Sequence, residues 1–384
     1  MCLCTLIITM RMSLPAQMQN KPTIVIAAIS SRPYVKAAVD AGYDVIAMDT
    51  FLDQDTQVLA KQCFYVPCVN YQFDKVSFLS TLSSTIATYG RDALTGFCYG
   101  AGFEGQPVLI AEIQKQLPLL GNQPATVQKC KDPVGFNQFC QRHGFATPAI
   151  TMETPTSPKG WLVKTMGASG GGHIKFAEQQ VSALSADEYY QQFQPGIPVS
   201  CLFLAGESGA SIVGVNEQWV VSSTDAPFQY GGAASQLQLS DDVLAEFKRF
   251  IAVATSHFGL KGLNSVDALL DDGRLVFLEI NPRLSATMDL YATQESSLLA
   301  AHVAAFQSNA AAMPEVLSEP KAHQIVYATT LTHSQTDKTW PEWVRDIPNV
   351  PQTFEVGMPI CTVVSHANTT EAAKQLTQTR AASL

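Results

Sequence analysis

The sequence lacks the features that would assign it to several common classes of protein. It has no uninterrupted apolar run of the roughly 18–20 residues that a membrane-spanning helix needs, and no Lys/Arg cluster that would bind a nucleic-acid backbone. Only 15% of the 384 residues are charged, and the formal net charge is -9 at pH 7. We therefore expect neither a membrane nor a nucleic acid as a partner. The hydrophobic content of 46% is typical of a globular chain with two or three domains.

The cysteines also lack the spacing of a structural site. There are nine, without CxxC pairs, and an odd number argues against a disulfide framework or a zinc knuckle. Cys2 and Cys4 form a lone CxC, for which two metal ligands are the alternative to two reduced thiols. The pattern favours a cytoplasmic protein in a reducing compartment.

Alternating apolar runs and helical patterns in residues 21–123 predict an N-terminal parallel α/β domain. Its strands are expected at 23–30, 43–49 and 94–100. Residues 1–20 come before this domain and are expected to be a flexible tail, because their apolar run has neither a preceding basic residue nor a cleavage site.

Residues 124–312 have a different sequence pattern, with several apolar strand-like runs in succession, and are expected to form a second domain with antiparallel sheets. Helices are expected over 132–144 and 240–259, the second with Ser240 as N-cap. Strands are expected in "PVSCLFLA", "ASIVGVN" and "QWVVSST", followed by a hairpin over 263–281. Residues 313–384 are too few and too irregular for an independent domain, and we expect them to pack on the core.

The turn after the first strand lacks the G-x-G-x-x-G pattern of a dinucleotide site, although Asp49 stands where a ribose partner would lie. A plain α/β domain is therefore favoured over a dehydrogenase, and Ser30 and Arg32 at this turn are candidates for substrate binding. Glu104 lies in "YGAGFEGQP", directly after a strand, where open α/β sheets bind ligands. It is a further substrate candidate, with a solvated surface loop as the alternative.

Lys164 ends an expected strand, and the glycine-rich stretch "GASGGGH" follows within three residues. The N–H groups of residues such as Gly170, Gly171 and Gly172 can cradle phosphate oxygens, and a lysine adds a positive charge. The order differs from the Walker motif, in which the lysine follows the glycines. The stretch predicts a phosphate-binding flap, with a glycine-rich hairpin beside a surface lysine as the alternative.

In "VFLEINPRLSA" the polar residues Glu279 and Asn281 interrupt an apolar strand two residues apart, so they share a face. If Asp271 pairs with Leu275 across a three-residue loop, Asp267 falls opposite Glu279. Two adjacent carboxylates resist ionisation unless a cation lies between them, and oxygen ligands of this kind suit Mg²⁺. The hairpin therefore predicts a magnesium site, and Arg283 just beyond it is a candidate for stabilising a phosphoryl group in transfer.

This combination resembles the ATP-grasp superfamily, which includes biotin carboxylase, carbamoyl-phosphate synthetase and D-alanine–D-alanine ligase. The resemblance covers about residues 22–310, including the α/β domain that precedes the family's ATP-binding domain. It implies ATP with Mg²⁺ as cofactors, Mn²⁺ being the alternative ion, and a flap lobe at about 145–195. The residues that it assigns are Asp267, Glu279 and Asn281 to the metal, Lys164 to the phosphates, and Arg283 to the phosphate or acyl phosphate.

Two parts of the expected nucleotide site depart from the family pattern. The linker "YYQQFQPG" matches the stretch that meets adenine, which makes Gln191, Gln192 and Gln194 candidates, where relatives often have Glu. Pro133 stands where many relatives carry a basic residue. Lys129 or Lys131 is then expected to supply that phosphate contact.

The resemblance implies an ATP-dependent ligase that joins a small-molecule carboxylate to an amine through an acyl phosphate, and it implies a homodimer. The motifs "ISSRP", "YGAGFEGQP" and "NPRLSAT" are similar to ATP-grasp proteins of tetrahydromethanopterin or methanofuran biosynthesis, such as tyramine–glutamate ligase. Two alternatives stay open. The departures at Pro133 and in the linker suggest a non-catalytic ATP-binding scaffold, and a bicarbonate-using carboxylase is the other.

Overall fold

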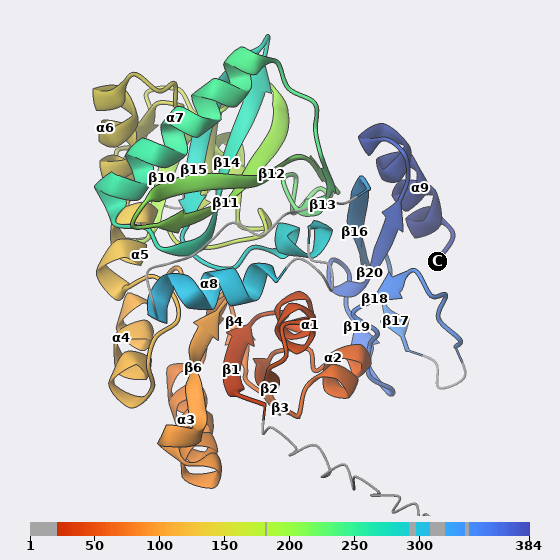
Figure 1. The fold of residues 1–384 in the computed structure, drawn as a ribbon. Helices are drawn as coiled ribbons and strands as arrows, with labels where there is room; N and C mark the ends of the chain where they lie inside the picture. Colours follow the sequence, from red (N-terminus) through yellow and green to blue (C-terminus); the bar gives the residue numbers. More distant parts are fainter. Residues whose placement is uncertain (1–20, 181–182, 292–296, 308–318, 335–337) are drawn as a thin grey trace, which may run out of the picture.

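The computed structural model describes residues 21–180, 183–291, 297–307, 319–334 and 338–384. Its first layer is a four-stranded parallel sheet (Figure 1) of strands β3 (Gln62–Tyr65), β2 (Asp44–Asp49), β1 (Thr23–Ala28) and β6 (Leu94–Tyr99), in that order. Strand β1 is buried along its whole length because helices cover both faces of a parallel sheet. The helices of this part are α1 (Arg32–Asp40), α2 (Gln54–Leu59), α3 (Lys75–Tyr89) and α4 (Pro107–Gln116).

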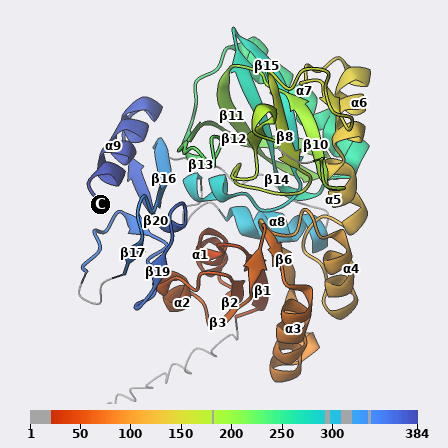
Figure 2. The same ribbon diagram turned by 180° about the vertical axis from the view of Figure 1, so that it is seen from behind.

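Two helices, α5 (Pro124–Lys131) and α6 (Pro133–His143), lead to a small antiparallel sheet. Asp132 caps α6 by accepting a hydrogen bond from the N–H of Val134, and Gly144 ends it in a left-handed conformation. Figure 2 shows β8 and β10 of the small sheet beside these helices. The order of the small sheet is β7 (Ile150–Thr151), β10 (Glu188–Gln192), β8 (Trp161–Thr165) and β9 (Lys175–Phe176).

An eight-stranded antiparallel sheet forms the largest layer. One expectation for it is wrong, because "ASIVGVN" and "QWVVSST" do not form two strands. Residues Gly209–Val220 form one continuous strand that pairs with neighbours on both sides, because Gly214 and Asn216 stay paired within the sheet instead of forming a turn. Helix α7 (Asp241–Phe258) packs on this sheet and starts at Ser240, whose hydroxyl accepts a hydrogen bond from the N–H of Val243. The strand order is β15 (Arg274–Asn281), β14 (Gly262–Asp271), β11 (Ile197–Gly206), β12 (Gly209–Val220), β13 (Tyr230–Ser235), β16 (Lys321–Tyr327), β20 (Pro359–His366) and β18 (Val344–Arg345).

The last part of the chain thus adds three strands to the edge of the large sheet. Helix α9 (Thr370–Ala382) packs on β16 and β20, and the short strands β17 (Thr332–His333) and β19 (Thr353–Phe354) pair with each other. Helix α8 (Leu298–Gln307) lies between the parallel sheet and the large sheet (Figure 1) and shares a core with both. The mixed α/β class, with a parallel sheet followed by antiparallel ones, is confirmed.

Among the described helices, none combines the length and apolarity that crossing a bilayer requires. The cysteines of the described part are all free thiols, and most of them are buried. Cys2, Cys4 and the expected tail at 1–20 lie outside the described residues.

Candidate active site

The hairpin of β14 and β15 places Asp267 directly opposite Glu279, the pairing that the sequence predicts. The three-residue turn expected for it is wrong. Asp271 pairs with Arg274, and the turn Asp272-Gly273 has positive φ angles of 46° and 74°, which suit the twist of a two-residue hairpin loop. A register shift beside Asp267 compensates for the shorter turn, so that the carboxylates still meet on one face.

A lysine ammonium lies among the oxygen atoms of this hairpin. Lys131 Nζ donates to Glu279 Oε2 and to Asn281 Oδ1, both at 2.8 Å. Asn281 in turn donates from Nδ2 to Asp267 Oδ2 at 2.7 Å. The three side chains that the sequence assigns to a metal therefore lie together, and two of them contact a cation that comes from the end of α5.

The two carboxylates of the hairpin have opposite pKa shifts. Burial, and then the charge of Glu279, raise the pKa of Asp267. Burial acts in the same direction on Glu279, but the ammonium groups of Lys131 and Lys164 outweigh it and hold the pKa of Glu279 below its usual range. Glu279 is therefore the ionised member of the pair, and positive charge nearby is what keeps it so.

Arg283 and Glu104 form a buried ion pair, although the sequence assigned them to different ligands. Arg283 Nε lies 2.7 Å from Glu104 Oε1, and the side chains are 9% and 1% exposed. The other oxygen of Glu104 accepts hydrogen bonds from the N–H groups of Gly102 and Phe103 at 2.8 and 3.1 Å. Burial works against the charge of Glu104, but Arg283 holds its pKa below the usual range. Glu104 therefore fixes the direction of the arginine instead of standing free for a substrate.

Lys164 on β8 is buried and donates to Gln191 Oε1 on β10 at 3.3 Å. Both line a small cavity of about 30 Å³ between the small sheet, the helices α5 and α6, and the hairpin. Burial opposes the charge of Lys164, yet Tyr189, and then Glu279 and Asp267, raise its pKa overall. The lysine therefore stays positively charged beside the expected nucleotide side of the hairpin.

The glycine-rich loop lies against two other parts of the chain. A Cβ on Gly171 would clash with the carbonyl oxygen of Phe228, and one on Gly172 would clash with the hydroxyl of Tyr71. Gly170 has open space around its Cα, and its carbonyl accepts a hydrogen bond from Tyr230 N at 2.8 Å. Glycine is needed here for close approach as well as for positive φ.

His173 at the end of the loop lines the small cavity, and its Nδ1 is buried without a hydrogen-bond partner in the described structure. Its ring stands edge-on to Tyr71, with the centroids 5.8 Å apart. Burial, and then the charge of Lys164, lower the pKa of His173 to about 4. The imidazole is therefore neutral.

A large cavity of about 430 Å³ also reaches the hairpin and shares Glu279 with the small cavity. Its walls come from the first domain, the glycine-rich loop, the hairpin and the C-terminal strands, and many of them are aromatic or aliphatic. Asp267, Glu279, Asn281 and Arg283 face it at one end. The other lining residues include Ile29, Ser30, Tyr34, Phe51, Asp53, Tyr71, Ser169, Gly170, Gln218, Tyr230, Ile325, Tyr327, Asp346, Gln352, Phe354 and Cys361.

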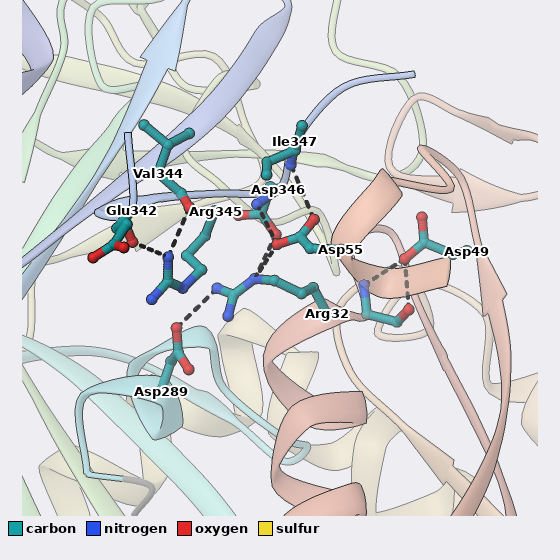
Figure 3. A network of polar contacts seen from close by, with 10 residues as sticks. Arg32, Asp49, Asp55, Asp289, Glu342, Val344, Arg345, Asp346 and Ile347 are labelled. Atoms are coloured by element: carbon teal, nitrogen blue, oxygen red, sulfur yellow. Dashed lines mark hydrogen bonds and ion pairs between the residues drawn. The ribbon is translucent and has the colours of Figure 1, made fainter. Parts of the chain in front are cut away.

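The remaining sequence-predicted residues lie in varied places. Ser30 lines the large cavity, whereas Arg32 does not and is held by Asp346 and Asp289 at 2.8 Å each (Figure 3). Lys129 and Gln192 are exposed, and Gln194 is half-buried. Neither cavity is lined by these last three side chains.

Asp53 and Asp346 are cavity residues that the sequence did not single out. They come from the β2–α2 connection and from the segment after β18, 293 residues apart by their numbers. Neither lies in a motif, so only the tertiary structure brings them to one cavity.

The hairpin fits a magnesium ion bound together with a nucleotide. Among the described residues, no group of three or more His, Cys, Asp or Glu side chains is arranged to hold a metal. Two carboxylates and a carboxamide oxygen are what the hairpin offers, and Mg²⁺ is commonly held by one or two carboxylates plus water and substrate phosphates. The Lys131 ammonium between Glu279 and Asn281 shows that a cation is accommodated there.

Comparison with known proteins agrees with this geometry. Residues 130–287 match the ATP-grasp domain family. Over 195 residues the chain is 26% identical to the carbamoyl phosphate synthase large chain of Deinococcus deserti, an alignment that spans 44% of this chain and 19% of that one.

Solved structures that cover nearly the whole chain include the following two. One is the biotin carboxylase domain of 2-oxoglutarate carboxylase from Hydrogenobacter thermophilus, determined with MgADP, ADP and bicarbonate. It has a TM-score of 0.69 at 10% identity and covers 94% of this chain and 89% of its own. The other is L-amino acid ligase from Bacillus licheniformis, with a TM-score of 0.66 at 14% identity and coverage of 94% and 97%. Residues 130–287 thus match the ATP-grasp domain family, and the chain as a whole shares the fold of these two solved structures.

Proposed function

We propose that the protein is an ATP-dependent ligase that joins a carboxylate to an amine through an acyl phosphate. The observation that carries the proposal is the position of Glu279, which lines both the small cavity beside Lys164 and the large cavity beside Arg283. A nucleotide on the Lys164 side would direct its terminal phosphate past Glu279 toward the large cavity. An acid and an amine have room there.

The residues of the hairpin have separate roles in this reaction. Asp267, Glu279 and Asn281 would hold Mg²⁺, which neutralises charge on the nucleotide phosphates when it is bound. Lys131 now donates to two of these residues, so it is released to donate to phosphate oxygens once the ion takes its place. Arg283, oriented by Glu104, donates to the oxygens of the phosphoryl group in transfer.

The chemistry needs positioning and charge neutralisation more than a nucleophilic side chain. A carboxylate oxygen attacks the terminal phosphorus, and the bond to the leaving oxygen of ADP breaks. The amine nitrogen then attacks the acyl carbon, phosphate leaves with the bonding electrons, and the nitrogen loses a proton. Because the walls of the large cavity include aromatic rings such as Tyr34 and Phe354, they exclude water that would otherwise hydrolyse the acyl phosphate.

We further infer that the product belongs to one-carbon cofactor biosynthesis, of the tetrahydromethanopterin or methanofuran type. The support is the similarity of the motifs around Ser30, Glu104 and Arg283 to proteins of that branch. In the structure these three residues lie on or beside the large cavity, where a substrate would be chosen.

The test is release of ADP from Mg-ATP in the presence of panels of acids and amines, with bicarbonate as one of the acids. We expect ADP only when an acid is present, and loss of roughly a hundredfold or more in Glu279→Ala, since charge stabilisation of this kind is worth that much. Asp92→Asn, which changes an exposed residue of the first domain, is the control. Tight Mg-ATP binding without ADP from any pair would point to the scaffold alternative, and undiminished turnover in Glu279→Ala would exclude the assigned role.

A further inference from the structure

The large cavity is lined by a second pair of carboxylates besides those of the hairpin. Asp53 and Asp346 line it together with Phe51 and Phe354. The charges that act on Asp53 are those of Asp346, Asp49, Asp55 and Arg32. Those that act most strongly on Asp267 are Glu279, Lys131 and Arg283. Asp53 and Asp346 come from elements other than the hairpin, and we call the part of the cavity wall that they form the acidic end.

Most carboxylates around the acidic end have partners of their own. Asp49 accepts from the N–H and hydroxyl of Ser31 at 2.6 Å each, and from two further backbone N–H groups. Asp55 accepts from the N–H groups of Asp346 and Ile347 at 3.0 Å each (Figure 3). Asp346 accepts from Arg32 Nε at 2.8 Å. These groups are therefore held by the fold itself.

Asp53 is the exception. It is only 6% exposed and lines the cavity, yet its carboxylate has no hydrogen bond or ion pair within the described part of the chain. Two nitrogens of the nearby Arg32 guanidinium, Nη2 and Nε, contact Asp289 and Asp346, and neither of these contacts is to Asp53. A buried carboxylate without a partner is costly, which favours a site that is completed by a cation from outside the chain.

The pKa of Asp53 is consistent with a missing partner. Burial, and then the negative charges of Asp346, Asp49 and Asp55, raise it well above the usual range, and Arg32 offsets them only in part. A positive group placed beside Asp53 would reverse this shift, so such a group is bound more tightly than a neutral one of the same shape.

We propose that Asp53 and Asp346 bind the ammonium group of a small organic amine, whose apolar body lies among the aromatic walls of the large cavity. The inference rests on the proposed function in one respect, that such an amine is a substrate of the ligase. A metal ion fits less well, because Asp49, Asp55 and Asp346 already accept hydrogen bonds from groups of the chain, which leaves few free oxygen ligands around Asp53. An ammonium needs only hydrogen-bond acceptors and a wall for its carbon chain.

The experiment is calorimetric titration of the full chain, without ATP, with benzylamine and hexylamine and with the matched neutral probes benzyl alcohol and hexan-1-ol. We expect the amines to bind on the order of tenfold or more tightly than the alcohols, as for a hydrogen bond to a charged group. Asp53→Asn should abolish this preference, and Asp346→Asn should reduce it. Asp92→Asn should leave it unchanged.

The control for folding is thermal unfolding without ligand, in which Asp53→Asn should be at least as stable as the parent. Equal binding of amines and alcohols would overturn the inference, and so would an unchanged preference in Asp53→Asn. Displacement of the amines from Asp53 by millimolar MgCl₂ would also overturn it, because a metal ion would then be the ligand. Since the titration contains no ATP, it tests the amine site independently of the ligase reaction. Amine preference without ADP formation would refute the ligase but keep the amine site.

Discussion

Lys129 and Lys131 are two residues apart on α5, but they have different surroundings. Lys129 is exposed, whereas the Lys131 side chain is 6% exposed and contacts Glu279 and Asn281. We expect Lys131→Ala to weaken Mg-ATP binding by about tenfold or more, because a charge-assisted contact to phosphate is lost. Lys129→Ala should have a much smaller effect. Titration calorimetry with Mg-ATP measures both, and similar losses in the two variants would show that Lys131 is not the phosphate lysine.

Asp53 leads to a prediction about stability and pH. Its pKa is raised in the folded protein by burial and by Asp346, Asp49 and Asp55, so the folded state binds the proton more tightly than the unfolded state. Stability from this group is therefore present at low pH and falls as the pH rises above about 4, the value of an exposed aspartate.

Asp53→Asn removes this fall in stability with rising pH, because the asparagine side chain does not ionise. We expect its melting temperature to exceed that of the parent by a margin that grows between about pH 5 and about pH 8.5. Because Asp49, Asp55, Asp346 and Arg32 are common to both proteins, the difference isolates Asp53. A margin that does not change with pH would mean that Asp53 has a partner in solution.

Single residues also show where the sequence was sufficient. The alternation of polar and apolar residues predicted that Glu279 and Asn281 share a face, and β15 has that geometry. The partnership of Glu104 with Arg283 was not predictable in the same way. It joins residues 179 positions apart, and neither local pattern specifies what its side chain meets.

At the scale of elements, the predicted pairing of Asp267 with Glu279 is correct although the predicted three-residue turn of the hairpin is wrong. The sequence shows a turn signature, but it does not show a register shift inside the strands. The shift beside Asp267 replaces the third loop residue that the prediction required. Such shifts depend on how the side chains pack against α7 and α5, which lie outside the hairpin.

The glycine-rich loop offers a matched pair of variants. Gly170 and Gly171 have nearly equal φ angles of 74° and 73°, so alanine strains the backbone similarly at both positions. A Cβ on Gly170 meets nothing within 4 Å, whereas one on Gly171 meets the Phe228 carbonyl. We therefore expect Gly171→Ala to raise the KM for ATP several-fold more than Gly170→Ala, because the loop must move away from the segment before β13.

The measurement is steady-state ADP release as a function of ATP, with Mg-ATP calorimetry as the readout that does not depend on turnover. Equal effects of the two alanines would assign the cost to backbone strain alone. In that case the contact with Phe228 does not position the loop.

At the scale of the whole molecule, Arg32 joins three parts of the chain that are distant in sequence. It belongs to α1, and it contacts Asp289, which follows the β14–β15 hairpin, and Asp346 of the C-terminal segment (Figure 3). Asp55 Oδ2 lies 4.0 Å from its Nε. The sequence suggested Arg32 as a substrate residue because it follows the first strand. In the structure its guanidinium is paired with carboxylates from three parts of the chain.

We expect Arg32→Met to destabilise the protein by on the order of 3–5 kcal/mol, since removing one partner of a buried ion pair leaves charges unpaired. Arg345→Met is the matched control, because Arg345 donates to the backbone carbonyls of Glu342 and Val344 rather than to carboxylates. Urea unfolding measures the free energy of both variants. A change in the slope of the transition for Arg32→Met would show that the first domain unfolds separately from the rest.

The loss of stability in Arg32→Met should also depend on pH, and the pKa of Asp289 determines whether it grows or shrinks as the pH falls. Burial opposes the charge of Asp289, but Arg32 holds its pKa below the usual range. Its contribution to stability is therefore present above about pH 4 and is lost as the pH falls through the folded-state pKa. Arg32→Met lacks this contribution at every pH, so the two proteins should differ most near neutral pH and converge in acid. A difference that is constant down to about pH 3 would mean that Arg32 acts through packing, and that the ion pairs with Asp289 and Asp346 do not hold the three parts together.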